Sequence, residues 1–185
     1  MKIPKQAKQI FKGVIFDVYQ WPQKMFDGNY ETFEMLKRPD TVQIIATQKN
    51  KILMSRERQP HTGYFYSLFG GRVDKNEKPL AAAKRELLEE SGLTTKNWKL
   101  ISTEKPFNKV DWTIYTYVAR DCKKINRQNL DSGEMIQVKI MSFDEFFEIV
   151  TASNFRGRDL ALFLLRLEHQ GKKYLNDFKK FIFNK

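Results

Sequence analysis

Three glutamates close to the end of one predicted helix are the residues of this chain best suited to chemistry. Glu86, Glu89 and Glu90 lie in the segment 71–93, GRVDKNEKPLAAAKRELLEESGL. Carboxylates in the last turn face the negative end of the helix dipole and repel one another, at roughly a few tenths of a kcal/mol per pair. Mg²⁺ or Mn²⁺ would relieve this repulsion, and Mg²⁺ usually binds together with substrate phosphates. The alternative is a solvated acidic face on which Arg85 pairs with Glu89.

The helix that carries these glutamates is predicted between Pro79 and Gly92. Proline suits the first turn, where its missing N–H is not needed, and glycine suits the position just past the last turn. Four apolar residues share one side at about 100° per residue, and we expect the glutamates on the other side. These four are Leu80, Ala83, Leu87 and Leu88.

The spacing of this segment resembles the signature of the Nudix hydrolases. Gly71, Glu77 and the run 85–93 reproduce the full pattern G-x5-E-x7-R-E-U-x-E-E-x-G-U, in which U is apolar. The resemblance implies an enzyme that hydrolyses a diphosphate linked to another group. It also implies the Nudix fold, an α/β fold of the α+β type in which a mixed β-sheet lies between helices.

The resemblance also assigns roles to residues of the site. About two or three Mg²⁺ ions, or Mn²⁺ in their place, would bind Glu86 and Glu90 with help from Glu89 and the backbone carbonyl of Gly70. A carbonyl approaches a metal closely only where no side chain intervenes, which explains a glycine there. The catalytic set would include Glu89 and Arg85, with Arg85 positioning Glu89 or Glu77. Glu77 would be an auxiliary ligand or a supporting residue.

Three further passages resemble ADP-ribose pyrophosphatases and related nucleoside diphosphate sugar hydrolases. The first is residues 1–40, an N-terminal antiparallel β extension that in these relatives forms a homodimer and touches the partner's nucleotide; residues 41–185 would be the Nudix hydrolase domain. Phe26, like Trp21 and Phe33, is then a candidate to stack on a base, and Arg38 to touch a phosphate or base. The alternative is that these aromatic residues form the core of the hairpin or dimer.

The other two passages lie before and after the segment 71–93. Residues 55–60, SRERQP, make Arg58 a candidate to grip the diphosphate with its planar guanidinium, or else to form a surface ion pair with Glu57 or a neighbour. Residues 133–138, GEMIQV, make Glu134 the candidate base or extra metal ligand, with Asp131 as a substitute. Gly71 completes the predicted substrate-binding set.

One departure widens the expected substrate class. ADP-ribose pyrophosphatases have Glu-x-Pro-Ala-Gly where this chain has residues 67–71, SLFGG. We therefore expect ADP-ribose or a related nucleoside diphosphate sugar as substrate. The alternatives are a Nudix pyrophosphohydrolase acting on nucleoside triphosphates or RNA 5′ ends, and a non-catalytic nucleotide-binding regulator.

Composition sets the remaining expectations. The 185 residues carry a net charge of +11, which favours anionic substrates, but the lysines are spread along the chain and we expect no stable nucleic acid partner. A single cysteine, Cys122, excludes an intrachain disulfide and is typical of a cytoplasmic protein. No apolar run follows Met1 and Lys2, and no stretch is long enough to span a membrane.

Alternating and helical patterns predict the other elements. Strands are expected at 12–21, 30–38, 41–47, 51–56, 98–103, 112–119 and 135–140, with a turn at Asp27-Gly28. Helices are expected at 143–151, capped by Ser142, and at 158–170. The segment 172–185 has apolar residues at helical spacing between lysines, so it either docks on its own domain or lies on a membrane surface; we favour docking.

Overall fold

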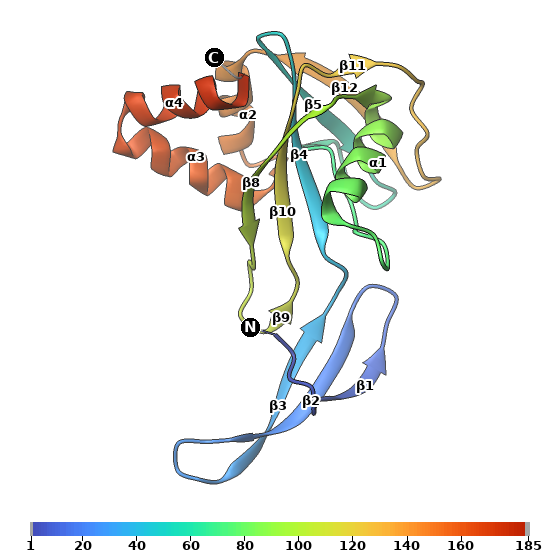
Figure 1. Ribbon diagram of the computed structural model, residues 1–185, viewed down its shortest axis with the longest axis vertical. Helices are drawn as coiled ribbons and strands as arrows, with labels where there is room; N and C mark the ends of the chain where they lie inside the picture. The colour runs from blue at the N-terminus through green and yellow to red at the C-terminus, as the bar shows by residue number, and fades with distance from the viewer. Residues whose placement is uncertain (1, 184–185) are drawn as a thin grey trace.

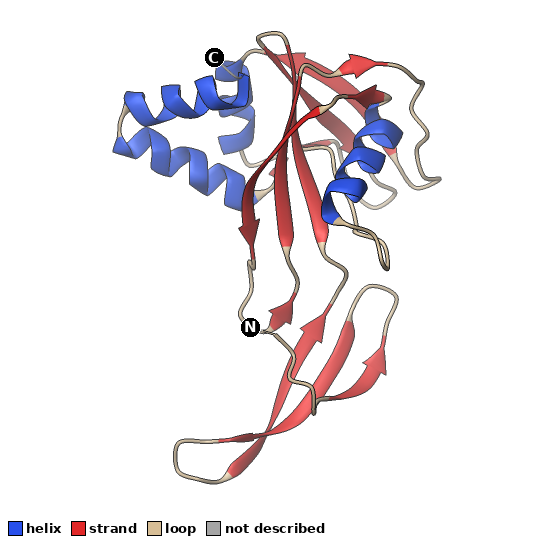
Figure 2. Cartoon of the chain, in the orientation of Figure 1, coloured by secondary structure: helices blue, strands red, loops and turns tan. Residues whose placement is uncertain are grey.

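The computed structural model describes residues 2–183, which form a large mixed β-sheet between helices and a smaller N-terminal sheet (Figures 1 and 2). The large sheet contains β4 (Thr41–Gln48), β5 (Lys51–Arg58), β6 (Phe65–Ser67), β8 (Asn97–Glu104), β10 (Ile114–Arg120), β12 (Met135–Met141) and β13 (Phe155–Arg156). Its order is β13-β6-β5-β4-β10-β8, and β12 pairs with β5. Since β4 and β10 are parallel while β10 and β8 are antiparallel, the sheet is mixed, as predicted.

Helices cover both faces of this sheet. Helix α1 (Pro79–Ser91) lies on one face, and α2 (Phe143–Thr151), α3 (Arg158–Gln170) and α4 (Lys172–Phe183) lie on the other (Figure 1). Ile44 and Ala46 pack in the cluster with α1, whereas Ile45 packs in the cluster with α2, α3 and α4. This alternation along β4 is what a strand buried on both faces requires.

Helix α1 has the predicted ends but not entirely the predicted faces. Pro79 begins the helix, and Gly92 ends it in the left-handed conformation with its N–H bonded to the Leu88 carbonyl. Glu90 is only 6% exposed, so the prediction that all three glutamates face away from the apolar side was wrong for this residue. The reason is helical geometry: Glu90 lies seven positions after Ala83 and three after Leu87, which places it on their side.

The N-terminal sheet contains β1 (Lys8–Lys12), β2 (Asp17–Lys24), β3 (Tyr30–Lys37) and the short strand β9 (Val110–Asp111), in that order. The single strand predicted at 12–21 is confirmed only from Asp17 onward, where β2 begins, while Lys12 is the last residue of β1. The chain turns between these strands, because the Gly13 N–H donates to the Phe16 carbonyl, and Val14 is 95% exposed. The β-forming residues Val14, Ile15 and Phe16 therefore occupy a turn instead of a strand. The turn at Asp27-Gly28 is confirmed, with Gly28 at φ 91.

The other predicted strands correspond to β3, β4, β5, β8, β10 and β12, with ends that differ by at most two residues. Short strands were missed, including β7 (Leu93–Thr94) and β11 (Lys123–Lys124). Helices α2 and α3 have the predicted bounds, and Ser142 caps α2 in a reciprocal capping box with Glu145. Apart from β1, which has five residues, each missed strand has two or three residues, which is too short to give a periodic pattern.

The C-terminal helix α4 docks on the domain, as predicted. Phe178 and Ile182 are buried in the cluster beneath α2 and α3, while Tyr174 remains exposed. Asn184 and Lys185, the end of the predicted segment, lie outside the described residues. Between residues 2 and 183 no helix has the length and apolar character needed to cross a bilayer.

Candidate active site

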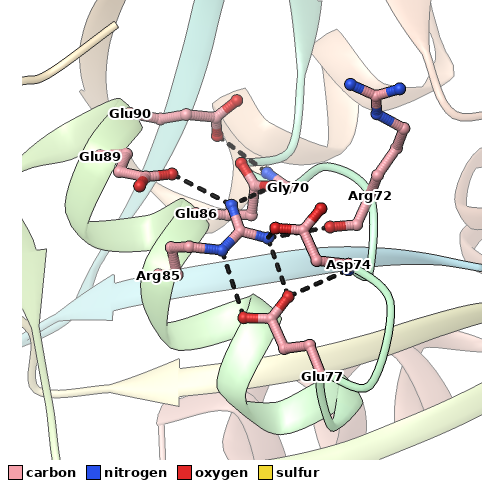
Figure 3. A network of polar contacts seen from close by, with 8 residues as sticks. All are labelled: Gly70, Arg72, Asp74, Glu77, Arg85, Glu86, Glu89 and Glu90. Atoms are coloured by element: carbon pink, nitrogen blue, oxygen red, sulfur yellow. Dashed lines mark hydrogen bonds and ion pairs between the residues drawn. The ribbon is translucent and has the colours of Figure 1, made fainter.

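The guanidinium of Arg85 holds the acidic side chains of α1 and the preceding loop together (Figure 3). Its Nη1 donates to Glu86 at 2.8 Å and to Glu89 at 3.1 Å, and its Nε and Nη2 donate to Glu77 at 3.2 and 3.0 Å. Nη2 also donates to the carbonyl of Arg72. These bonds, that to Glu77 first, raise the pKa of Arg85, and the bond to Arg85 lowers the pKa of Glu77. Arg85 therefore positions carboxylates.

Glu90 is the buried member of the acidic set. The backbone N–H of Gly70 donates to its Oε2 at 2.8 Å, which fixes the carboxylate against the loop before α1. Burial raises the pKa of Glu90 well above its ordinary value, and the negative charges of Glu86, Glu57 and Glu134 raise it further. A carboxylate in this position calls for a cation nearby, because burial penalises its charged form.

The two glycines before α1 leave room for the acidic side chains and free one carbonyl. A Cβ at Gly71 would lie 2.4 Å from Oε1 of Glu86, so the carboxylate would have to move if any other residue stood there. The carbonyls of Phe69 and Gly71 accept hydrogen bonds from Ile44 and Val42 of β4. The carbonyl between them, that of Gly70, accepts no hydrogen bond from the described residues.

Glu134 joins this group from the loop before β12. Its backbone N–H donates to the Asp131 carbonyl, and its side chain is half-buried. Burial raises the pKa of Glu134, and the charge of Asp131 adds to the rise. The charge of Glu134 in turn raises the pKa of Glu57, Glu86 and Glu90, so this loop acid lies close to the acidic cluster. Asp131 is more exposed than Glu134.

Glu57 belongs to the same cluster and was missed. It lies on β5, is only 8% exposed, and its pKa is raised, mainly by burial. Oε1 lies 3.9 Å from Nη1 of Arg156, and among the described residues no ion pair joins Glu57 to Arg58. One signal was available: Glu57 continues the every-second-residue series of Leu53 and Ser55, which are both buried.

The donor set fits a hard divalent cation. Among residues 2–183 no three carboxylate or histidine side chains are arranged to hold a metal as they stand. Arg85 donates to Glu86, and the Gly70 N–H donates to Glu90. The chemistry of the donors nevertheless suits Mg²⁺ or Mn²⁺, which prefer oxygen ligands. The residues that would hold the ion are Glu86, Glu89, Glu90 and Glu134 with the Gly70 carbonyl.

The predicted substrate residues lie at different distances from this cluster. Arg58 is exposed at the end of β5, opposite Met135, the neighbour of Glu134. Arg38 is half-buried and its guanidinium lies 4.2 Å from the centre of the Trp112 ring. Phe26 is fully exposed in the turn between β2 and β3, at the end of the N-terminal sheet remote from α1 (Figure 1). Within a single chain, Phe26 therefore does not reach the glutamates.

Trp21 and Phe33 face each other across β2 and β3, with ring centroids 5.0 Å apart, and Trp21 is buried. For these two aromatic residues the structure favours the hairpin-core alternative over base stacking. Cys122 is buried, and burial raises its pKa to about 12. Its thiol is therefore not activated as a nucleophile.

Known proteins resemble this chain over most of its length. The profile of the NUDIX domain matches residues 37–161. An ADP-ribose pyrophosphatase of Bacillus subtilis (strain 168) is 28% identical over 149 residues, covering 77% of this chain and 80% of that protein. A methanol dehydrogenase activator of Bacillus methanolicus is 30% identical over 149 residues, covering 78% and 80%.

The fold has a counterpart among solved structures. The crystal structure of an ADP compounds hydrolase superposes with a TM-score of 0.71 at 21% identity, covering 91% of this chain and 95% of that one. The fold, the complete acidic signature and the domain match lead to the same assignment. The chain belongs to the Nudix family and is a pyrophosphatase of the Nudix type.

Proposed function

We propose that this protein hydrolyses the diphosphate bond of ADP-ribose or a related nucleoside diphosphate sugar with the help of Mg²⁺ or Mn²⁺. The products would be a nucleoside monophosphate and a sugar phosphate. The observation that carries the proposal is the convergence of Glu86, Glu90 and Glu134 beside the carbonyl of Gly70, which accepts no hydrogen bond from residues 2–183. The relative from Bacillus subtilis supports ADP-ribose as the first substrate to test.

Each group of the site has a proposed task. A bound Mg²⁺ would supply positive charge for the diphosphate and lower the pKa of an attacking water. Glu134, which no arginine or lysine binds among the described residues, would orient that water or accept its proton. Arg85 would keep Glu86 and Glu89 in place. Arg58 would grip the diphosphate, since its exposed guanidinium is at the end of the strand that carries Glu57.

A substrate panel with product analysis tests the proposal. The purified protein is incubated with Mg²⁺ and, separately, ADP-ribose, other nucleoside diphosphate sugars, nucleoside triphosphates and a 5′-triphosphate RNA. Release of AMP and ribose 5-phosphate from ADP-ribose supports it. Pyrophosphate from triphosphates or RNA, without cleavage of the sugar compounds, would instead establish the pyrophosphohydrolase alternative. Nucleotide binding with no turnover on any compound would establish the regulator alternative.

The N-terminal extension is the proposed dimer contact and, at residues 1–40, a unit distinct from the hydrolase domain at 41–185. Its strands and turns expose several large apolar residues: Ile10, Phe11, Val14, Ile15, Phe16, Met25, Phe26 and Tyr30. Exposed apolar side chains in such number mark interaction surfaces. A homodimer would let Phe26 of one chain reach the nucleotide of the other. Sedimentation of the full chain and of Val14→Asp tests this, since the variant should sediment as a monomer.

The proposed compartment is the cytoplasm. The single cysteine is buried and forms no disulfide within the chain, which suits a reducing environment. Fractionation of cells that produce the protein tests this, with the diphosphatase activity expected in the cytosolic fraction.

A further inference from the structure

Two arginines converge beside the active site without carboxylate partners. Arg72 pairs with Thr41 across an isolated antiparallel bridge, so these two side chains lie on the same face. The Trp112 indole N–H donates to Thr41 Oγ1 at 3.1 Å, and the guanidinium of Arg38 lies over the Trp112 ring. Thr41 and Trp112 thus bring Arg38 and Arg72 to one place.

Neither guanidinium is neutralised by the described residues. No ion pair joins Arg38 or Arg72 to an acidic side chain, and Nε of Arg38 is buried without a hydrogen-bond acceptor. The nearest acidic residue in sequence, Asp40, already accepts a hydrogen bond from the Thr113 N–H at 2.8 Å. Burial and the charge of Arg72 lower the pKa of Arg38. Two like charges side by side indicate that an anion belongs between them.

Aromatic rings lie next to Arg38. Phe107 stacks on Trp112, with ring centroids 6.1 Å apart and an interplanar angle of 19°, and Phe107 is 57% exposed. The Phe16 ring lies 5.6 Å from the Arg38 guanidinium. An exposed aromatic face next to unpaired guanidinium groups suits a nucleotide, whose base stacks and whose phosphate accepts hydrogen bonds.

The arginine pair lies next to the loop of Gly70 and Gly71, which is proposed to bind the metal. Arg72 directly follows Gly71, which lies against Glu86, and the Arg72 carbonyl binds Arg85 (Figure 3). In Figure 3 the Arg72 side chain points away from the carboxylates, so it is free to hold another part of the same substrate.

We propose that Arg38 and Arg72 form one phosphate-binding subsite for the nucleotide half of the substrate. This inference rests on the proposed function and adds a specificity element to it. The phosphate is either the 5′-phosphate of the nucleoside or a further phosphate carried on its ribose. The sequence alone predicted no role for Arg72, which is assigned from the structure.

Ligand binding without metal tests the subsite independently of hydrolysis. Calorimetry in EDTA compares adenosine, AMP and adenosine 2′,5′-bisphosphate for the wild-type protein, Arg72→Met, Arg72→Lys and Arg38→Met. Arg166→Met removes an exposed arginine of α3 and serves as the matched control. We expect AMP or the bisphosphate to bind about tenfold or more tightly than adenosine in the wild type and control. Arg72→Met should abolish this preference, and Arg72→Lys should restore it in part.

The outcomes separate the two sources of phosphate. If AMP already binds more tightly than adenosine, the subsite holds the 5′-phosphate. If only the bisphosphate binds more tightly than adenosine, the subsite holds a ribose phosphate. Equal affinity for all three ligands, or a preference that survives in Arg72→Met, overturns the proposal. Because Arg72 is exposed, Arg72→Met should fold normally even if Arg38→Met, which loses the stack on Trp112, does not. Hydrolysis of ADP-ribose by the wild-type protein shows separately whether the proposed function holds.

Discussion

The backbone N–H of Gly70 donates a 2.8 Å hydrogen bond to the buried carboxylate of Glu90. This bond ties the loop before α1 to the last turn of the helix, so the carbonyl and the carboxylates that would hold a metal belong to one unit. Gly70 has φ 149, and a Cβ there would lie 2.0 Å from the Val42 carbonyl oxygen. The loop can therefore take this path only with glycine at position 70.

The neighbouring glycine gives the most local test of the site. In Gly71→Ala the new methyl would meet the Glu86 carboxylate at 2.4 to 2.7 Å and displace it. We expect Mn²⁺ affinity, measured by electron paramagnetic resonance, to fall about tenfold or more, as for other disturbed ligand shells. Gly63→Ala is the control, since no atom lies within 4 Å of a Cβ at that position. Equal Mn²⁺ affinity of both variants would show that Glu86 is not a ligand.

Glu89→Gln and Glu90→Gln test the catalytic role of the helix. Turnover should fall by orders of magnitude in each, because an amide cannot replace a charged metal ligand. The fold should persist, since the glutamine oxygen at position 90 can still accept the hydrogen bond from Gly70. Steady-state kinetics and circular dichroism together check this prediction. Near-normal turnover in both variants would rule out the proposed metal role.

Stability without metal should depend on pH through Glu90. Its pKa is raised in the folded protein, so the native state binds more protons than the unfolded state above the ordinary value of about 4.5. The stability of the metal-free protein should therefore fall as the pH rises from about 4.5 through the raised pKa, relative to Glu90→Gln. Mg²⁺ should reverse the trend. Melting curves in EDTA and in Mg²⁺ check this; parallel pH profiles for both proteins would contradict it.

Much of this arrangement could be predicted from the sequence because its pattern is local. The spacing of the signature predicts that the glutamates lie close to the end of α1, and Pro79 and Gly92 predict the ends of the helix. The capping box of Ser142 and Glu145 likewise fixes the start of α2. Such features depend on residues within one or two turns of each other.

What could not be predicted depends on pairing between distant segments. Glu57 reaches the cluster because β5 pairs with β12, which begins next to Glu134. Arg72 meets Arg38 only through the bridge to Thr41 and the Trp112 side chain. A charged residue within a strand gives no indication in the sequence of which distant acid it will face.

Variants of Glu57 and Arg156 distinguish a role of Glu57 in metal binding from a purely structural ion pair. Its nearest cation is Arg156, at 3.9 Å, so a purely structural Glu57 predicts that Glu57→Gln and Arg156→Met have the same effect. We expect a different result, because Glu57 is buried and its charge adds to the rise in the pKa of Glu90. Glu57→Gln should weaken Mn²⁺ binding severalfold and raise the Mg²⁺ concentration needed for half-maximal turnover, whereas Arg156→Met should leave both within about twofold. Matching Mn²⁺ affinities in the two variants would assign Glu57 to the ion pair alone.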